Sequence, residues 1–312
     1  MVRIGIDLGG TNIAAGVVTD DGKILHHVET PTRAERPWQP VVEDMIAVTK
    51  RALSESGHSV DDLQSIGVGV PGLAINGVVA FCTNLGWHDV PLEETFRAAI
   101  DKPLYIDNDA NVAGLAEAMA GVSAGVPNSV FLTLGTGLGG GIIINKKIYT
   151  GAHGVGGELG HLTFIADGEM CTCGKRGCLE RYASATGMIR LGCEAMRTHP
   201  HSGLAKAANQ DSANMTAKLI VDQAKANDPT AMMVFDQYIH YLAQGINSII
   251  SFIDPDMIVL GGGVSKAGEF LLDAVRQALP TYIFYKTLPF PSIELAVLGN
   301  DAGIIGAAML GA

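Results

Sequence analysis

The sequence predicts an α/β protein made of two related domains. Strand patterns alternate with amphipathic helix patterns along most of the chain, which is typical of α/β proteins. The succession of strand, glycine-rich turn, strand, short turn and strand occurs twice, at the N-terminus and near the middle. With 312 residues, the chain is long enough for two domains. A pattern repeated over half a chain therefore favours two related α/β domains that face each other.

The first copy of the pattern opens the chain. We expect strands over Val2–Asp7, Ile13–Thr19 and Lys23–Thr30, joined by a turn at Gly9-Gly10-Thr11 and a hairpin turn at Asp20-Asp21-Gly22. Together they form an antiparallel meander. In chain order there follow a helix on the apolar spacing of 42–53, a strand over Ser65–Val70, a short helix near 92–100, a strand over Leu104–Asp107 and a helix over Ala110–Ala120.

The second copy lies in residues 130–150. We expect a strand over Val130–Leu134, a glycine-rich turn over Gly135–Gly141, a strand over Ile142–Asn145, a tight turn at Lys146-Lys147 and a strand over Ile148–Thr150. The remainder is more helical. Its expected helices are Tyr182–Met196, Thr216–Ala226, Thr230–Ile253, Lys266–Leu279 and Asp301–Leu310, its strands are Met257–Leu260 and Ile293–Leu298, and residues 199–215 form a polar surface loop.

Composition and charge exclude several classes of protein. Hydrophobic residues make up 47% of the chain and charged residues 17%, which indicates a globular protein rather than a disordered one. The net charge of -11 argues against nucleic acid or an anionic membrane as the main partner. A strand pattern starts at Val2 and no apolar run is long enough to span a membrane. We therefore expect a cytoplasmic protein.

The glycine-rich turns are candidates for phosphate binding. Leu8-Gly9-Gly10-Thr11 corresponds in position to Leu134-Gly135-Thr136-Gly137. Glycine lets several backbone N–H groups converge on a phosphate, and a threonine adds a hydroxyl donor. Neither turn matches a P-loop, because no Gly-Lys-Ser/Thr follows it, and neither is a good dinucleotide-binding turn, because a strand follows where a helix should. The alternative is that both are ordinary hairpin turns.

Other residues near these turns have candidate roles in nucleotide binding. Asp7, at the end of the first strand, is placed to hold Mg²⁺ through water. A weaker signal is Gly261-Gly262-Gly263, which is either an ordinary strand-to-helix turn or a bare backbone surface for adenosine.

One stretch carries a metal-binding pattern. His161 is followed by Cys171, Cys173 and Cys178 within 17 residues, and one imidazole with three thiolates makes a filled tetrahedral Zn²⁺ site. Such a zinc is structural, because no position remains for a reactive water. The alternative is a set of free buried thiols, which is our default for Cys82 and Cys193.

Carboxylate and amide side chains next to these motifs are candidates for sugar binding and catalysis. The zinc loop would hold Glu158 and Glu180 in place, and carboxylates are good partners for sugar hydroxyls. Asn108-Asp109 stands at a strand end before a helix, so Asp109 is either an N-cap or a general base for an attacking alcohol. Asn84 lies in a loop that could reach a sugar.

Together these segments resemble the ROK family of sugar kinases and sugar-responsive repressors. The resemblance covers essentially the whole chain. It is carried by Asp7–Asn12, Gly69–Gly72, Asn84–Trp87, Asp107–Asn111, Leu134–Gly141, Glu158–Glu180, Leu260–Val264 and Asp301–Gly303.

The resemblance implies a duplicated actin-like ATPase (ribonuclease H-like) fold, with two α/β domains around a cleft. We place the smaller domain at 1–118 plus 299–312 and the larger one, with the zinc loop, at 119–298. It further implies that Asp109 is the catalytic base and that Asn108, Glu158, His161 and Glu180 hold the sugar.

The resemblance also implies the cofactors and the assembly. ATP with Mg²⁺ would bind through the phosphate and adenosine residues, which are Asp7, Gly9, Gly10, Thr11, Asn12, Gly135, Thr136, Gly137, Gly261, Gly262 and Gly263. The segments 84–87 and 183–187 are most similar to the glucokinase branch, which implies a homodimer and the conversion of glucose to glucose 6-phosphate.

Alternative functions within this resemblance remain. N-acetylglucosamine and N-acetylmannosamine kinases share the same sugar-holding residues. A sugar-sensing repressor would carry a helix-turn-helix module in front, and we expect none because the first strand begins at Val2. A non-catalytic ATPase of the same fold would lack the zinc loop.

Overall fold

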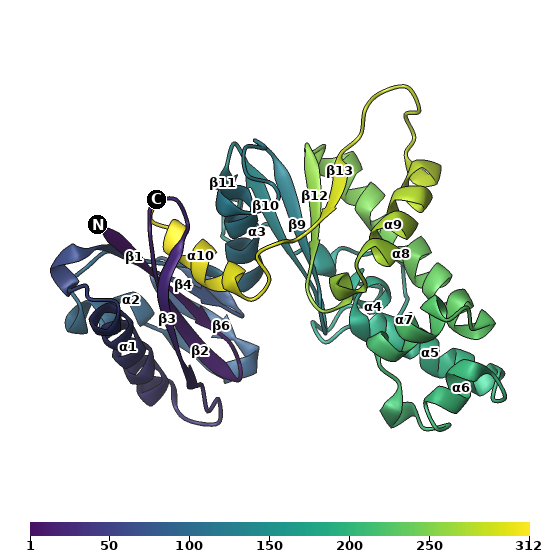
Figure 1. Ribbon diagram of the computed structural model, residues 1–312, viewed down its shortest axis with the longest axis horizontal. Coiled ribbons are helices and arrows are strands. Elements are labelled where there is room, and N and C mark those ends of the chain that lie inside the picture. Colours follow the sequence, from purple (N-terminus) through teal and green to yellow (C-terminus); the bar gives the residue numbers. More distant parts are fainter. The chain divides into compact units, whose positions relative to one another are not determined.

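The computed structural model describes all residues, 1–312, and they form two compact units (Figure 1). Unit 1 comprises Met1–Phe131, Gly141–Gly157 and Ala296–Ala312, and unit 2 comprises Leu132–Gly140 and Glu158–Leu295. Residues 119–131 and 141–157 therefore belong with the N-terminal part by their contacts. The sequence-based bounds, which stay a prediction, place those residues in the second domain.

The main sheet of unit 1 is the predicted meander extended by two parallel strands. Its order is β3-β2-β1-β4-β8, with β1 antiparallel to β2 and parallel to β4. The strands are β1 Val2–Leu8, β2 Asn12–Val18, β3 Ile24–Pro31, β4 Leu63–Val70 and β8 Leu104–Asn108. Because β1, β4 and β8 run parallel, Asp7, Gly69 and Asp107 come to the same edge of the sheet.

Helices cover both faces of this sheet. The helices of unit 1 are α1 Trp38–Glu55, α2 Leu92–Ala99, α3 Asp109–Ala120 and α10 Asp301–Met309. The apolar side of α1 packs on Ile4, Ile6 and neighbouring buried side chains in one core cluster. The helix α10 lies against the opposite face, where Gly5 has no side chain to keep the helix backbone away. Helix α3 packs beside α10 in a second cluster.

A small antiparallel sheet completes unit 1 and was absent from the sequence prediction. It consists of β5 Leu73–Ile75, β6 Val78–Cys82 and β7 Trp87–Val90, in the order β5-β6-β7. Its strands are short and follow a Pro71-Gly72 break, so their local pattern is weak. Asn84 lies in the turn between β6 and β7.

The second large sheet confirms the predicted repeat. Its order is β11-β10-β9-β12-β13, which matches the first sheet position by position. Its strands are β9 Ser129–Leu134, β10 Leu138–Ile144, β11 Lys147–Ile148, β12 Met257–Gly261 and β13 Ser292–Leu295. The boundary between the two units crosses β9 and β10. Two meanders with the same order of flanking parallel strands are the signature of a duplicated fold.

The helices of unit 2 differ in detail from those expected. They are α4 Glu180–Ala183, α5 Ala185–Thr198, α6 Gly203–Ala207, α7 Ala217–Lys225, α8 Pro229–Ile253 and α9 Glu269–Tyr282. The single helix predicted over 182–196 is wrong in one respect, because the helix is interrupted at Ser184. This residue has an extended backbone, and its hydroxyl caps α5. The loop predicted over 199–215 contains α6, because Leu204 and Ala205 are buried against neighbouring helices.

Three other element bounds were also misplaced. Helix α9 starts at Glu269 rather than Lys266, because Gly268 before it adopts φ +69°. The strand expected over 293–298 ends at Leu295. The tight turn falls on Asn145 and Lys146, both with positive φ, so β11 is Lys147–Ile148 instead of 148–150. None of the helices combines the length and the apolar character that a membrane crossing requires.

Candidate active site

The first glycine turn connects β1 to β2 and carries exposed backbone. Its ends are closed by a hydrogen bond from the Gly9 N–H to the Asn12 carbonyl at 2.9 Å. Gly10 and Thr11 are exposed. No lysine or arginine lies in this turn, so an anion there would be bound by N–H groups and by the Thr11 hydroxyl.

Asp7 stands just before this turn. Its side chain is removed from water, and this desolvation raises the pKa of the carboxyl group. A desolvated carboxylate next to a turn with exposed backbone would be a suitable anchor for a hydrated Mg²⁺ ion. The structure thus places Asp7 where the sequence predicted it, at the strand end.

The second turn has the same design in unit 2. Its ends are closed by a hydrogen bond from the Gly135 N–H to the Gly137 carbonyl at 3.0 Å. Thr136 is exposed at its tip. A Cβ atom on Gly137 would lie 2.7 Å from Oε2 of Glu180, so the turn packs closely against a predicted sugar-binding carboxylate.

The third glycine run has a packing reason as well as a predicted binding role. Gly262 adopts φ +83°, and a Cβ atom there would lie 2.7 Å from the backbone nitrogen of Leu134. The glycine run therefore allows the segment after β12 to pass close to the backbone at the end of β9. Gly263 has open space around it, and its contact with adenosine stays a prediction.

Asn108 and Asp109 sit at the junction of β8 and α3. The N-cap alternative for Asp109 is wrong: Asn108 caps the helix, and its Oδ1 accepts from the N–H groups of Ala110 at 2.9 Å and Asn111 at 3.4 Å. Asp109 is the first helical residue and is exposed. Its carboxylate accepts from its neighbour Ala110 at 2.9 Å, which directs it along the N-terminal turn of α3.

Two further residues hold this junction. Oδ1 of Asp107 accepts from the Asn108 N–H at 2.7 Å and from the buried Asn111 amide at 2.8 Å. The Asn108 amide donates to the Gly72 carbonyl at 3.2 Å, which ties the junction to the Pro71-Gly72 break. The side chain of Asn108 is therefore largely occupied by the backbone, with one amide hydrogen left for a ligand.

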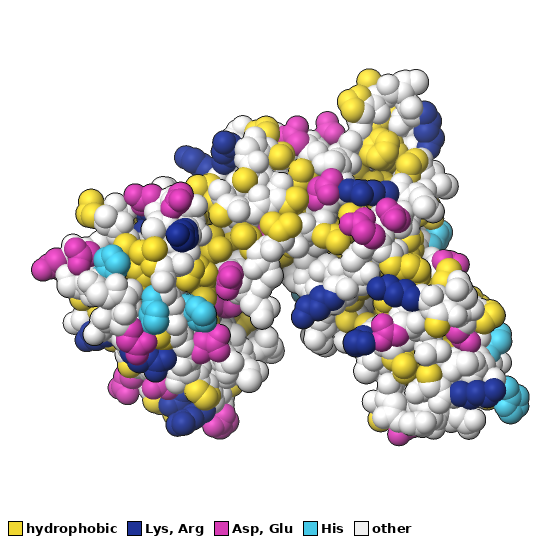
Figure 2. All heavy atoms as spheres, viewed as in Figure 1, with side chains coloured by type: hydrophobic (Ala, Val, Ile, Leu, Met, Phe, Trp, Pro, Cys, Tyr) yellow, Lys and Arg dark blue, Asp and Glu magenta, His cyan; other side chains and the backbone are white.

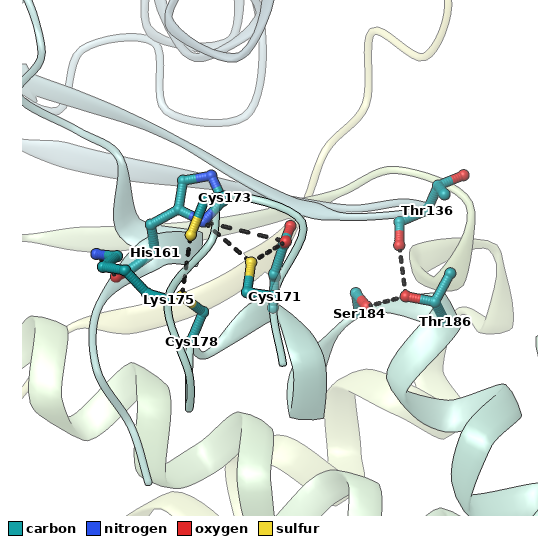
Figure 3. A network of polar contacts seen from close by, with 9 residues as sticks. Thr136, His161, Cys171, Cys173, Lys175, Cys178, Ser184 and Thr186 are labelled. Carbon is teal, nitrogen blue, oxygen red and sulfur yellow. Dashed lines mark hydrogen bonds and ion pairs between the residues drawn. The ribbon is translucent and has the colours of Figure 1, made fainter. Parts of the chain in front are cut away.

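The predicted zinc ligands gather in unit 2. Ligand atoms of His161, Cys171, Cys173 and Cys178 all lie within 4.8 Å of one another (Figure 3). The sulfur atoms of Cys173 and Cys178 are 3.6 Å apart, and Nδ1 of His161 is 3.7 Å from the sulfur of Cys171. With zinc–sulfur bonds of about 2.3 Å, two corners of a tetrahedron lie about 3.8 Å apart, so the donor set fits zinc.

Glu180 contacts this cluster directly. The thiol of Cys171 donates to Oε1 of Glu180 at 3.0 Å, and the same oxygen lies 4.0 Å from Nδ1 of His161. Burial and this hydrogen bond raise the pKa of the Cys171 thiol, so zinc binding has to release its proton. Glu158 precedes the short turn Leu159–His161 and is exposed.

Comparison with known proteins places the chain in a family. The model of the ROK family matches residues 3–312. The chain belongs to the ROK family. It is 38% identical over 310 residues to a glucokinase of Halalkalibacterium halodurans, covering 98% of this chain and 94% of the relative. An N-acetyl-D-glucosamine kinase of Mannheimia succiniciproducens is 31% identical over 98% of both chains.

A solved ROK structure is similar along the whole chain. The ROK family glucokinase of Streptomyces griseus in complex with glucose and AMPPNP has a TM-score of 0.82 and 33% identity, and the match covers 99% of both chains. The fold of this ROK chain is accordingly the duplicated actin-like ATPase fold that the sequence predicted.

Sequence reasoning missed several residues that contact the candidate site of this ROK chain. Thr32 lies 21 positions after Thr11 and carries no local pattern that connects it to the first turn. Ser184 and Thr186 stand in a stretch that the family resemblance singled out without a role for either hydroxyl. Asn111 was known only as part of a motif. Thr32 and Thr186 donate to the backbone of another segment, Ser184 contacts the Thr186 hydroxyl, and Asn111 donates to the Asp107 carboxylate, and a linear pattern reveals none of these contacts.

Proposed function

We propose that this protein transfers the γ-phosphate of ATP to the 6-hydroxyl of glucose, yielding glucose 6-phosphate and ADP. The observation that carries the proposal is the full-length similarity to a ROK glucokinase crystallised with glucose and AMPPNP. Two exposed glycine turns without cationic side chains and an exposed aspartate at a helix start supply groups that such a reaction needs.

Asp109 is the proposed general base. The sugar O6 attacks the γ-phosphorus, the bond from that phosphorus to the bridging oxygen breaks, and the hydroxyl proton passes to the Asp109 carboxylate. Exposure of this side chain in unit 1 leaves it accessible to an incoming alcohol. It is the first residue of α3, at the positive end of the helix dipole.

The proposed sugar contacts are Asn84, Asn108, Glu158, His161 and Glu180. His161 would contribute its second ring nitrogen, because Nδ1 faces the cysteine cluster. Zinc, when bound, supplies a rigid four-coordinate centre and no reactive water. Gly137 packs against Oε2 of Glu180 and so limits the orientation of this carboxylate from the side of the second glycine turn.

The proposed nucleotide contacts are the two turns and the third glycine run. Gly9, Gly10, Thr11 and Asn12, together with Gly135, Thr136 and Gly137, would bind phosphates, and Asp7 would hold Mg²⁺ through water. Residues 261–263 would lie against adenosine. These assignments rest on exposed backbone in each turn and on the desolvated carboxyl group of the half-buried Asp7.

The substrate is tested by ATP-coupled phosphorylation of four sugars side by side. Glucose should give the highest kcat/KM among glucose, mannose, N-acetylglucosamine and N-acetylmannosamine. A clearly higher kcat/KM for an acetamido sugar would replace glucose by that sugar and keep the kinase. Absence of phosphorylation of all four sugars, with retained sugar binding, would favour a sugar-sensing protein instead.

We further propose a cytoplasmic homodimer. An exposed apolar tip supports self-association: hydrophobic side chains gather at the end of the loop that follows α9 (Figure 2), where Phe284, Leu288 and Phe290 are exposed. Light scattering of the purified protein should give a mass near twice the 32.6 kDa of one chain. A single-chain mass over the working concentration range would exclude the dimer.

A further inference from the structure

We propose that Thr32 and Thr186 are positioning residues that orient the peptide groups of the two glycine turns for the phosphates of ATP. The inference rests on the proposed function, because it assumes that these turns bind a nucleotide. Neither threonine belongs to its turn, to the metal cluster or to the candidate sugar contacts.

Thr32 holds the first turn from the end of β3. Its hydroxyl donates to the Gly9 carbonyl at 2.6 Å, and its backbone N–H donates to the Thr11 carbonyl at 2.8 Å. Its side chain is fully buried, with 0% of its surface exposed. A buried hydroxyl with one good acceptor is fixed in direction. Thr32 therefore holds two carbonyls of this turn, one through its hydroxyl and one through its backbone N–H.

Thr186 holds the second turn in the same way from the start of α5. Its hydroxyl donates to the Thr136 carbonyl at 2.8 Å (Figure 3), and the N–H of Ala185 donates to the Gly135 carbonyl at 2.9 Å. The Ser184 hydroxyl lies 2.9 Å from that of Thr186 and accepts from the Gly187 N–H at 3.2 Å. Since Thr186 gives its hydrogen to Thr136, Ser184 donates to Thr186.

The geometry of the peptide bond turns these contacts into orientation. In a trans peptide the N–H points opposite to the C=O of the preceding residue, and the chain has no cis peptides. Tying back the carbonyls of Gly9, Gly135 and Thr136 therefore turns the N–H groups of Gly10, Thr136 and Gly137 the other way. Residues 10, 136 and 137 lie outside the flanking strands, which end at Leu8 and Leu134 and resume at Asn12 and Leu138.

The arrangement suits a polyanion for an energetic reason. An N–H group that must rotate before it binds phosphate loses part of the interaction to reorganisation, whereas a fixed one does not. Each turn lacks a cationic side chain, so the direction of its N–H groups has to supply affinity. The same device in both halves of the duplicated fold, from different parts of the chain, argues against a chance hydrogen bond.

The test replaces each hydroxyl by a methyl group of similar size. Thr32→Val and Thr186→Val should each raise the Kd of Mg²⁺–AMPPNP by about 3- to 10-fold, measured by calorimetry on the full chain. The Kd of glucose in the absence of nucleotide should stay within about twofold. Thr32→Ser and Thr186→Ser keep the hydroxyl and should restore nucleotide affinity.

Matched controls make the same chemical change elsewhere. Thr49 is buried in α1 and donates to the Met45 carbonyl at 2.8 Å, and Thr198 donates to the Ala195 carbonyl at 3.1 Å at the far end of α5. Thr49→Val and Thr198→Val should leave both Kd values unchanged.

The outcomes separate this inference from the proposed function. Valine variants that bind AMPPNP as wild type does would overturn the inference and leave the kinase standing. A parallel loss of sugar affinity and thermal stability without rescue by serine would also overturn it, since the hydroxyls would then only stabilise the fold. If the valine variants bind AMPPNP more weakly but the wild-type protein phosphorylates no sugar, the inference is supported and the proposed function is removed.

Discussion

Oε2 of Glu180 lies where a side chain on Gly137 would have to go, because a Cβ atom built on Gly137 comes within 2.7 Å of it. The second glycine turn and a carboxylate proposed to bind sugar are thus in contact within unit 2. The other oxygen of Glu180 accepts from Cys171 in the metal cluster at 3.0 Å. The orientation of this carboxylate therefore depends on both neighbours.

Gly137→Ala should displace the Glu180 carboxylate and weaken sugar binding. The new methyl group meets the end of a flexible side chain, so the fold should accommodate it with a change in Tm of at most about 2 °C. The Kd of glucose without nucleotide should rise by about 3- to 10-fold, because one charged hydrogen-bond acceptor is misplaced. Calorimetric titration of glucose measures this.

Gly135→Ala is the matched control, since the nearest atom to a Cβ atom there lies 3.9 Å away. It should bind glucose as wild type does. Equal glucose affinity of all three proteins would show that the contact between residues 137 and 180 has no role in the sugar site.

Asp109→Asn should abolish most of the chemistry and keep binding. The amide has the shape of the carboxylate but accepts no proton, so kcat should fall by at least about 10²-fold with the Kd of glucose within about threefold. Steady-state kinetics and sugar titration measure the two quantities. Asp101→Asn, which changes an exposed carboxylate beside Arg97, should alter neither. Near-normal turnover of Asp109→Asn would remove this residue from the role of base.

Cys173→Ser should remove the metal and loosen the loop around it. A serine hydroxyl is a poor zinc ligand, so the zinc content should fall from about one ion per chain to well below half an ion. Elemental analysis of the purified protein measures the content, and glucose affinity should fall with it. Cys193→Ser changes a cysteine outside the cluster and should leave zinc unchanged. Full zinc content in Cys173→Ser would refute the ligand assignment.

Asp7→Asn should stabilise the protein without ligands at neutral pH and impair its reaction. Desolvation raises the pKa of this carboxyl group in the folded state above its value in the unfolded state. In the pH window between these two pKa values, the folded state binds more protons than the unfolded state. Its contribution to stability therefore falls as pH rises through the window. Asparagine removes that penalty, so Tm should rise by about 1–4 °C at pH 7.5 and by less at pH 4.5.

Differential scanning fluorimetry at both pH values measures the gain, with exposed Asp61→Asn as the control that should show none. Kinase activity of Asp7→Asn should fall, because the proposed anchor for Mg²⁺ is lost. A lower Tm than wild type at pH 7.5 would mean that the Asp7 carboxylate stabilises the fold instead.

Part of the candidate site could be predicted from the sequence, because its residues lie close together along the chain. His161, Cys171, Cys173 and Cys178 fall within 18 consecutive positions, and the structure brings their ligand atoms together. The contact of Thr32 with the first glycine turn could not be predicted, since no sequence pattern shows which carbonyl a threonine in an extended segment will bind. The N-cap at Asn108 was misplaced by one residue, because Asn and Asp are equally good caps and only the backbone geometry separates them.

The repeated strand and turn pattern, the cysteine and histidine cluster and the family could all be predicted from the sequence, because periodicity, spacing and motif are local properties of the chain. Only the folded chain shows that Ser184 and Asn108 cap helices α5 and α3, which hydroxyls hold the glycine turns, and that Glu180 lies between Cys171 and Gly137. Those are contacts between segments that meet only after folding. Their direction is set by the packing around them and by the need to pair every buried polar group.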